Sequence, residues 1–430
     1  VHRRALVCAG SPFSDDEQLF SDDGWLVMRE IIVSGMRPTG RLHLGHYHGV
    51  LKNWLRLQDE AECYFFVADW HALTTHYETT HGISDAVWDM LIEWLAVGVD
   101  PDKAVLFIQS HVPEHAELAL LLGMLTPLSW LERVPTFKDQ QEKLRERDLA
   151  TFGFLGYPLL MTADILVYDA HKVPVGADQV AHLEISRELA RRFNSFYGRS
   201  ADAAAQVEKS LQIMGKRAAK TFLSLQQRFQ QDGDALAVSE AVVFLGAQAG
   251  LSTEMREQLL AHLEGKGREI LREPQALLTA ASKMPGLDGQ KMSKSYGNTI
   301  PLREAPEVVQ KKIRTMPTDP ARVARTDPGT PEKCPVWALH QVYSGPETQA
   351  WVRNGCTTAG IGCLDCKQPV IEAVLAEQAP IRERVEYWAA RPEQLKEIAH
   401  AGAQRARQRA AQTLERVRAA MGLAHERHDC

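Results

Sequence analysis

Residues 31–54, IIVSGMRPTGRLHLGHYHGVLKNW, decide how the rest of the chain is read. The β-branched run at 31–33 is typical of a buried parallel strand. Glycine and proline at 35–40 predict a turn, and apolar residues at helical spacing from Leu44 to Leu55 predict a helix. The free N–H groups and the positive dipole at the start of that helix predict an anion site above the sheet.

The histidines on the first turn of this helix indicate what the anion is. His43 and His46 are placed to donate hydrogen bonds to phosphate oxygens, and Gly45 leaves room for an adenine ring against the backbone. A metal site of His43, His46 and His48 is an alternative, but no carboxylate is interleaved with them. A histidine cluster satisfied within a core helix is the second alternative.

The sequence KMSKS, residues 291–295, lies far downstream. The odds that one given five-residue sequence occurs by chance in a chain of this length are roughly one in several thousand, so the match is specific. Together, PTGRLHLGH and KMSKS resemble the class I aminoacyl-tRNA synthetases. Features described below resemble the bacterial-type tryptophanyl-tRNA synthetases, over about Ile31–Gly422. The resemblance implies a Rossmann-like (HUP-type) catalytic domain.

Further strands and helices predict an α/β fold with a doubly wound parallel sheet. Strands are expected at 63–68, 105–109 and 173–175, with helices such as 84–97 and 180–193 between them. The helix at 84–97 is expected to be capped by Ser84. From Arg199 to Arg272 the pattern is helical without strands, which compact relatives lack. We therefore expect a helical insertion, whose basic residues either touch RNA or only face solvent: Lys209, Lys216, Arg217 and Lys220.

Composition sets outer bounds on function. The chain has 430 residues, a net charge of −6 and 45% hydrophobic residues, so RNA contacts must come from local basic patches. No apolar run has the length of a membrane span. Residues 1–27 are acidic, unlike a targeting peptide, and are expected either to be a disordered extension or to lie upstream of the true start. The seven uneven cysteines do not form a secreted disulfide framework, which favours the cytoplasm.

The segment FGFLGYPLLMTADILVY, residues 152–168, is the predicted specificity segment. Tyr157, Met161 and Asp164 share one helical face. A carboxylate on an apolar face must accept hydrogen bonds to offset its burial. An indole ring, with its single N–H donor and large apolar surface, suits an apolar pocket that contains such a carboxylate. The resemblance assigns the indole contact to Asp164; the alternative is that Asp164 caps a neighbouring helix. The full predicted tryptophan site is Val33, His71, Tyr157, Met161, Asp164, Val173, Val175 and Gln179.

The resemblance also implies the ATP site and the charge-stabilising groups. The predicted ATP-binding residues are Arg37, Pro38, Thr39, Gly45, His46, Gly176, Ala177, Asp178, Met284, Lys291, Met292, Ser293, Lys294 and Ser295. Many relatives have Gln where this chain has Arg37. Catalytic roles are expected for Lys138, Lys291, Lys294, His43 and His46, with Mg²⁺ on the phosphates. Flanking Pro285, Gly286 and Gly289 predict a mobile KMSKS loop.

Four late cysteines have the spacing C-x21-C-x6-C-x2-C and predict a metal centre. They are Cys334, Cys356, Cys363 and Cys366. Some tryptophanyl-tRNA synthetases carry a four-cysteine [4Fe–4S] centre at nearly this spacing, so the resemblance implies such a cluster. Structural zinc and free thiols are the alternatives that the spacing leaves open.

The last part of the chain is expected to be helical. A basic helix is predicted over 304–325, and two helices over 369–421 that separate near Arg391. The resemblance makes 304–430 an anticodon-binding domain; the alternative is that its arginines are only solvated. They are Arg382, Arg384, Arg405, Arg407, Arg409, Arg416 and Arg418. The other predicted units are 1–27, 28–198 and 199–272, with the KMSKS loop in 273–303.

The resemblance implies a tryptophan–tRNA ligase that activates L-tryptophan with ATP and transfers it to tRNA(Trp). It further implies a cytoplasmic homodimer. Two alternatives stay open: a tyrosyl-tRNA synthetase, and a non-catalytic RNA-binding or regulatory paralog. Tyrosine would require an acceptor placed for a phenol, whereas paralogs usually lose signature residues that are intact here.

Overall fold

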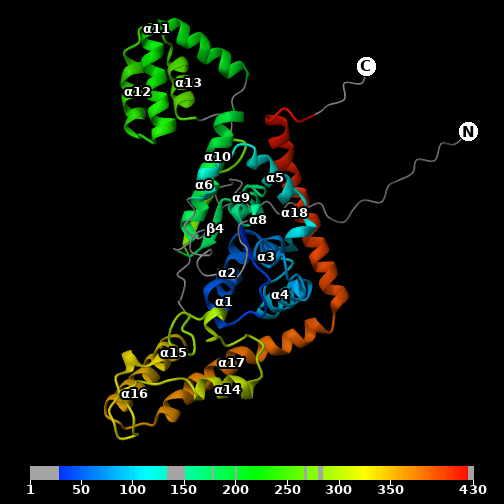
Figure 1. Ribbon diagram of the computed structural model, residues 1–430, viewed down its shortest axis with the longest axis vertical. Helices are drawn as coiled ribbons and strands as arrows, with labels where there is room; N and C mark the ends of the chain where they lie inside the picture. Colours follow the sequence, from blue (N-terminus) through cyan, green and yellow to red (C-terminus); the bar gives the residue numbers. More distant parts are fainter. Residues whose placement is uncertain are drawn as a thin grey trace, which may run out of the picture.

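The computed structural model describes residues 29–132, 151–176, 179–198, 201–265, 269–278 and 284–424 (Figure 1). Within them, five parallel strands form one sheet in the order β3-β2-β1-β4-β5. The strands are β1 (Ile31–Met36), β2 (Glu62–Val67), β3 (Ala104–Ile108), β4 (Lys172–Val175) and β5 (Gln275–Leu278). The strand order reverses beside β1, so a crevice is expected at the carboxyl ends of β1 and β4.

Helices connect and cover these strands. They are α1 (Leu44–His46), η1 (Tyr47–Leu51), α2 (Lys52–Glu60), α3 (Asp69–His76), α4 (Ile83–Val97), η2 (Gln109–His111), α5 (Glu114–Gly123), α6 (Leu128–Glu132), α8 (Phe152–Leu155), α9 (Tyr157–Leu166) and α10 (Val180–Tyr197). The helix predicted after the HLGH sequence is present, but its second turn, η1, is a π-helical turn. Such turns are frequent at functional sites.

Each face of the sheet carries its own apolar core, as the strand period of two requires. Ile32 and Phe65 belong to one core, in which Phe65 stacks on Trp54 with ring centroids 4.1 Å apart. Val33 and Phe66 belong to the other core. Adjacent residues on β1 and β2 therefore face opposite layers, which fixes the strand register.

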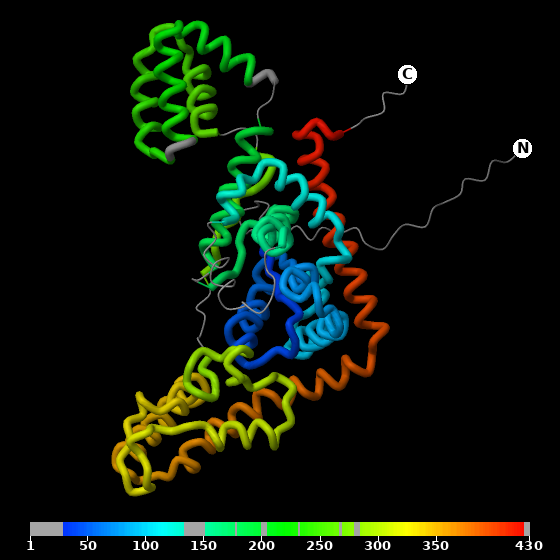
Figure 2. Tube along the Cα trace, viewed as in Figure 1, coloured from blue at the N-terminus to red at the C-terminus, as the bar shows by residue number. Residues whose placement is uncertain are grey.

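A lobe of three helices projects from the catalytic body (Figures 1 and 2). It comprises α11 (Ala201–Asp232), α12 (Leu236–Gly246) and α13 (Thr253–Leu263). The lobe has a separate apolar core that includes Phe222, Ala241 and Leu259. Gly215, at φ 77°, interrupts α11, because a left-handed residue cannot continue an α-helix.

The C-terminal region wraps back onto the sheet. Its elements are η4 (Lys294–Tyr296), α14 (Pro306–Arg314), η5 (Pro331–Lys333), α15 (Pro335–Tyr343), α16 (Pro346–Thr357), α17 (Cys363–Ala389) and α18 (Pro392–Ala420). In Figure 1, α17 and α18 follow one side of the molecule from α16 to the C-terminus. A Cβ at Gly402 on α18 would overlap the carbonyl oxygen of Leu106, so glycine permits helix and edge strand β3 to meet.

Three local predictions differ from the structure. The helix predicted over 304–325 ends at Arg314, and a loop with its own hydrogen bonds follows to Thr330. Ser84 does not cap α4; the N-cap is Gly82, at φ 82°. Strand β5 was not predicted, because Gln275–Leu278 is short and largely exposed. Within the described ranges, no helix is long and apolar enough to cross a membrane.

Candidate functional site: a nucleotide turn beside an apolar cavity

Internal hydrogen bonds organise the turn after β1 and the start of the helix after it. The N–H groups predicted to be free there are used within the chain, and that of Leu44 donates to the Ile300 carbonyl at 3.0 Å. The N–H of Gly45 donates to Nδ1 of His43 at 3.1 Å, and the N–H of His43 donates to Nδ1 of His46 at 3.2 Å. Burial lowers the pKa of His43 to about 4 and that of His46 to about 3, with Lys294 adding to both effects. Both rings are therefore neutral near pH 7, with Nε2–H left as the donor to a ligand.

Gly45 has a further role beyond the predicted one. A Cβ at Gly45 would lie 2.8 Å from Nδ1 of His43 and 3.4 Å from Cβ of Met292. Glycine therefore lets the His43 ring fold back over the helix start. Met292, which is 4% exposed, packs into the same core as Leu44.

The KMSKS loop lies directly against this turn. Nζ of Lys294 donates to the carbonyl oxygens of Thr39 at 3.1 Å and Gly40 at 2.9 Å. Immediately after the loop, Pro301 pairs with His43 in an antiparallel bridge. The structure thus brings together two motifs that are about 250 positions apart in the sequence.

Asn298 holds the KMSKS loop and was missed by sequence reasoning. It is 3% exposed. Its Oδ1 accepts from the N–H of Ser293 at 2.8 Å, and its Nδ2 donates to Asp288 at 2.7 Å and to the Lys291 carbonyl at 3.2 Å. No sequence signal separates this asparagine from an ordinary turn residue.

The other predicted ATP residues vary in position. Arg37 lines the crevice and donates to the Thr75 hydroxyl, whereas Lys291 is exposed. Met284 is buried, and its carbonyl accepts from the N–H of Met292 at 2.9 Å. The hydroxyls of Ser293 and Ser295 lie 2.8 Å apart. Pro38, Thr39 and Gly176 lie at the ends of β1 and β4, while Lys138, Ala177 and Asp178 fall outside the described residues.

A cavity of about 430 Å³ opens beside the turn, at the carboxyl ends of β1 and β4. This volume suits a small-molecule ligand. All eight residues of the predicted tryptophan site line it: Val33, His71, Tyr157, Met161, Asp164, Val173, Val175 and Gln179. Phe154, Phe66 and Ile165 make the walls more apolar, and Tyr157 bonds to His182 at 3.0 Å.

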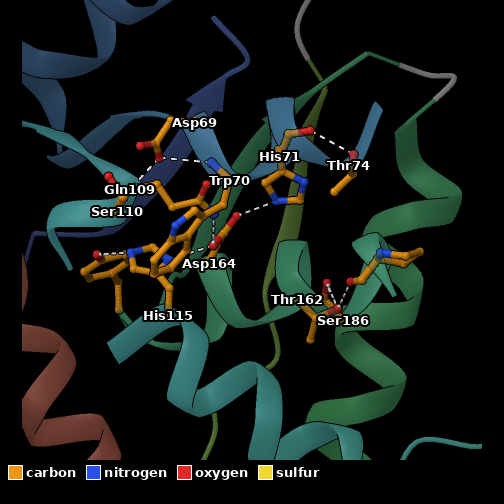
Figure 3. Close-up of polar contacts among 12 residues, drawn as sticks. Asp69, Trp70, His71, Thr74, Gln109, Ser110, His115, Thr162, Asp164 and Ser186 are labelled. Atoms are coloured by element: carbon orange, nitrogen blue, oxygen red, sulfur yellow. Dashed lines mark hydrogen bonds and ion pairs between the residues drawn. The ribbon is translucent and has the colours of Figure 1, made fainter. Parts of the chain in front are cut away.

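Asp164, which is 2% exposed, is the buried carboxylate of this cavity. Its Oδ2 lies 2.8 Å from Nε2 of His71, and its Oδ1 lies 2.8 Å from Nε2 of Gln109 and 2.6 Å from Nδ1 of His115 (Figure 3). Burial alone would raise the pKa of Asp164, but the hydrogen bonds from His115 and His71 lower it to about 2. The carboxylate is therefore ionised, and it does not cap a helix.

Asp69, which begins α3 just after β2, has a structural role. It does not line the cavity. Its Oδ1 accepts from the N–H groups of Trp70 at 3.0 Å and Ser110 at 3.1 Å, which fixes the start of α3 against η2 (Figure 3). His71, two residues later, is directed to Asp164 instead.

Comparison with known proteins agrees with this geometry. The family described as "tRNA synthetases class I (W and Y)" matches residues 28–212 and 221–377. The chain belongs to this family. It is 59% identical to the tryptophan–tRNA ligase of Ralstonia nicotianae and 42% identical to that of Thermotoga maritima, covering 92% and 91% of this chain and 99% of each relative.

Solved structures place the fold in the same family. Tryptophanyl-tRNA synthetase from Campylobacter jejuni, complexed with ADP and tryptophan, matches with a TM-score of 0.69 and 27% identity. The match covers 91% of this chain and all of that one. The parallel Rossmann-like sheet and helical C-terminal region expected from the sequence are thus confirmed.

In this synthetase-family chain, the four late cysteines meet at one place. Cys334, Cys356, Cys363 and Cys366 line a cavity of about 20 Å³, and all four are free thiols. Burial, with the other three thiols, raises the pKa of Cys366 to about 12. In the described part of the chain, no group of three or more His, Cys, Asp or Glu side chains has the arrangement of a metal site.

Two buried cations accompany the thiols. Arg322, 8% exposed, also lines the cavity, with Nη1 3.8 Å from Sγ of Cys356 and with Nε left without a partner. Lys367, 3% exposed, donates to the carbonyls of Arg314 and Met316, each at 2.7 Å. One buried carboxylate, Asp319, lines the same cavity, so the two cations leave an excess of positive charge, which suits a group that carries net negative charge.

The arginines of α18 make contacts within the chain, so they are not only solvated. Arg416 donates to Asp169 at 2.6 Å, Arg407 pairs with Glu114 at 3.0 Å, and Arg418 pairs with Glu117. Arg409 also contacts Asp169, and Arg405 donates to the Pro101 carbonyl. On α17, Arg384 donates to the Ala96 carbonyl and Arg382 contacts Gln378 at 3.5 Å. Except for Arg382, whose contact lies within α17, these side chains fasten the C-terminal helices to the part of the chain that carries the sheet.

Proposed function

We propose that this chain is a tryptophan–tRNA ligase, which activates L-tryptophan with ATP and transfers it to tRNA(Trp). The observation that carries the proposal is the position of the Asp164 cavity beside the HLGH turn, with Lys294 of KMSKS on that turn. Relatives that are 59% and 42% identical have the same activity by name. As a step of translation, the reaction takes place in the cytoplasm.

Tryptophan lies in the cavity, with its ring between Met161, Val173 and Val175. The walls are apolar, and Asp164 accepts the indole N–H. A cavity with a buried acceptor rejects phenylalanine, because that ligand leaves the carboxylate unpaired. Tyr157, His71, Val33 and Gln179 complete the lining.

ATP lies across the strand ends, with its phosphates at the start of α1. The neutral rings of His43 and His46 donate from Nε2 to phosphate oxygens. Arg37, Pro38 and Thr39 border the turn, and Gly45, Gly176, Ala177, Asp178, Met284 and Met292 surround the adenosine. The same nucleotide contacts Lys291, Ser293, Lys294 and Ser295.

The tryptophan carboxylate attacks the α-phosphate in line, and pyrophosphate leaves. No side-chain nucleophile is required, because catalysis consists of positioning and charge stabilisation. Lys294, Lys291 and Lys138 stabilise negative charge that grows on the α-phosphate and on the leaving group. Mg²⁺, which accompanies ATP in this family, neutralises part of the phosphate charge. The terminal adenosine hydroxyl of tRNA(Trp) then attacks the carbonyl carbon of the adenylate, which forms the aminoacyl ester, breaks the acyl–phosphate bond and releases AMP.

The four cysteines are proposed to hold a [4Fe–4S] cluster with a structural role. The support is a set of four reduced thiols around one cavity, with Arg322 and Lys367 buried beside them. Anaerobically purified protein is expected to absorb near about 400 nm and to contain iron and sulfide. Cys363→Ser should remove the band, and Cys63→Ala, a buried thiol outside the cavity, should keep it. Zinc in a colourless preparation would overturn the cluster.

A homodimer is proposed as well, as the resemblance implies. Its support is an exposed apolar patch on α5 and α6, made of Leu120, Met124 and Leu128, which are 61–69% exposed. Analytical ultracentrifugation should find a dimer that Met124→Asp dissociates. A wild-type monomer at micromolar concentration would overturn this part.

Aminoacylation of two transcripts tests the function as a whole. We expect tRNA(Trp) to be charged with tryptophan, and tRNA(Tyr) with tyrosine not to be charged. Charging of tRNA(Tyr) would instead support the tyrosyl alternative. Folded protein that charges neither would favour the RNA-binding paralog.

A further inference from the structure

The carboxylate of Asp164 has one acceptor site left. A carboxylate offers about four acceptor sites, two on each oxygen. Oδ1 accepts from Gln109 and His115, so both of its sites are used. Oδ2 accepts only from His71 among the described residues, so one site stays open. The indole of tryptophan has one N–H, which matches this single open site.

The donors also set the direction in which that site faces. His71 lines the cavity, whereas Gln109 and His115 are fully buried and lie outside its lining. The donors to Oδ1 therefore lie outside the cavity lining, whereas Oδ2 bonds to His71, which lines the cavity. Oδ2 is thus the oxygen on the cavity side. Figure 3 shows His71 and His115 approaching Asp164 from different elements, α3 and α5.

Tyr168 holds the imidazole ring of His115 on the side away from Asp164. Its hydroxyl lies 2.6 Å from Nε2 of His115. Because Nδ1 donates to the ionised Asp164, the two ring nitrogens have separate partners, and the Tyr168 hydroxyl holds the ring from the Nε2 side. Burial and the Asp164 charge raise the pKa of Tyr168, so that hydroxyl keeps its proton. Tyr168 itself is fully buried and stacks on Tyr64 at 4.8 Å.

We infer that His115 and Tyr168 are positioning residues that hold the Asp164 carboxylate so that its one open site meets the indole N–H. Neither residue touches the ligand. They act on amino-acid selection through Asp164, in the way that outer groups orient a ligand-binding side chain. The inference rests on the proposed function and deepens it, because it names the groups that make the cavity selective for a ring with an N–H donor.

The experiment compares Tyr168→Phe with Tyr64→Phe. Both variants remove one buried phenol oxygen from the same aromatic stack, but the Tyr64 hydroxyl donates to Glu62 at 2.7 Å and is not linked to Asp164. KM and kcat are measured by ATP–pyrophosphate exchange with tryptophan and with 3-benzothienylalanine, in which sulfur replaces the indole N–H.

The Tyr168 variant is expected to raise the KM for tryptophan about tenfold, the scale of one hydrogen bond to a charged group. KM for ATP and KM for the sulfur analogue should change less than about twofold, and Tyr64→Phe should leave the tryptophan-to-analogue ratio at the wild-type value. His115→Gln keeps an N–H donor and should retain more selectivity than His115→Phe.

An equal change for tryptophan and the analogue would overturn the inference, since it would show general loosening of the cavity. The inference would also be overturned if the ratio of the KM for tryptophan to the KM for 3-benzothienylalanine stayed at the wild-type value in every variant. If the wild-type protein exchanges with neither amino acid, the proposed function fails first, which separates the two outcomes. Circular dichroism and melting curves confirm that each variant compared is folded.

Discussion

Nζ of Lys294 lies 2.9 Å from the carbonyl oxygen of Gly40, and this hydrogen bond joins the KMSKS loop to the turn after β1. A second bond to Thr39 at 3.1 Å fixes the ammonium over the same turn. Both acceptors are backbone carbonyls, and among the described residues Lys294 forms no ion pair; burial lowers the pKa of Lys294, and the charge of Glu93 acts against this. The lysine can transfer these bonds to a phosphate when the nucleotide binds.

Lys294→Ala is expected to lower the rate of tryptophan-dependent pyrophosphate exchange by about 100-fold or more, the scale of losing one group that stabilises developing charge. The decrease should appear in kcat, because the charge grows in the transition state. Lys311→Ala, which removes an exposed lysine of α14, is the matched control. Near-normal exchange by the Lys294 variant would refute the assigned role.

Asp164→Asn is expected to reduce selection of tryptophan over phenylalanine by about tenfold or more. The amide has fewer acceptor sites than a carboxylate, and its NH₂ opposes the donors His71, Gln109 and His115. The ratio of kcat/KM values in pyrophosphate exchange measures this. Asp69→Asn, at the same sheet edge but outside the cavity, should keep the ratio. Unchanged discrimination in the Asp164 variant would remove the indole contact from the account.

Glu93 should make stability depend on pH. Glu93 is fully buried on α4. Its Oε2 accepts from the N–H of Leu42 at 2.8 Å, and its Oε1 lies 3.2 Å from Nε of Arg303. Burial raises its pKa to about 7, against which the Leu42 and Arg303 contacts act only in part. The folded-state pKa is above the unfolded one. Its contribution to stability is therefore complete below pH 4.5 and is lost as the pH rises through about 7.

Glu93→Gln tests this, since it keeps an acceptor for Leu42 but cannot ionise. Between pH 4.5 and 8, wild type should lose up to about 3 kcal/mol relative to the variant. Urea midpoints at pH 5, 6, 7 and 8 give the difference between the two proteins. Parallel curves for both proteins would show that Glu93 does not titrate in this range.

Arg416→Ala should loosen α18 from the catalytic body. Arg416 bonds both oxygens of Asp169, at 2.6 and 2.7 Å, and removing it leaves a largely buried carboxylate with weaker partners. We expect a loss of about 1–3 kcal/mol. Arg407→Ala, which breaks a more exposed pair with Glu114, should cost less than about 1 kcal/mol. Urea midpoints and the rate of tryptic cleavage in α18 measure both; equal effects would contradict the anchoring role of Asp169.

Much of the fold was predictable because strand and helix periods are local signals. The runs before Gly35 and around Phe65 became β1 and β2, and the tail separated into two helices at Arg391 as predicted. Strand β5 was missed because four exposed residues carry little pattern. The helix over 304–325 was overestimated, because its composition is helical but the backbone after Arg314 bonds elsewhere.

The cavity lining was predictable as well, since the residues on one face of α9 and at the strand ends converge there. The hydrogen-bond donors to the Asp164 carboxylate could not be predicted. Gln109 and His115 lie about 50 positions away, in segments without a motif, and only the folded chain brings them to Oδ1. The same holds for the α18 arginines, whose partners are set by tertiary contact.

We propose that the cavity selects tryptophan for activation by ATP. ATP–pyrophosphate exchange on the full chain, with tryptophan, tyrosine and phenylalanine in parallel, measures this selection. We expect rapid exchange with tryptophan and background rates with the other two. Exchange with tyrosine at a comparable rate, or none with tryptophan from folded protein, would contradict it.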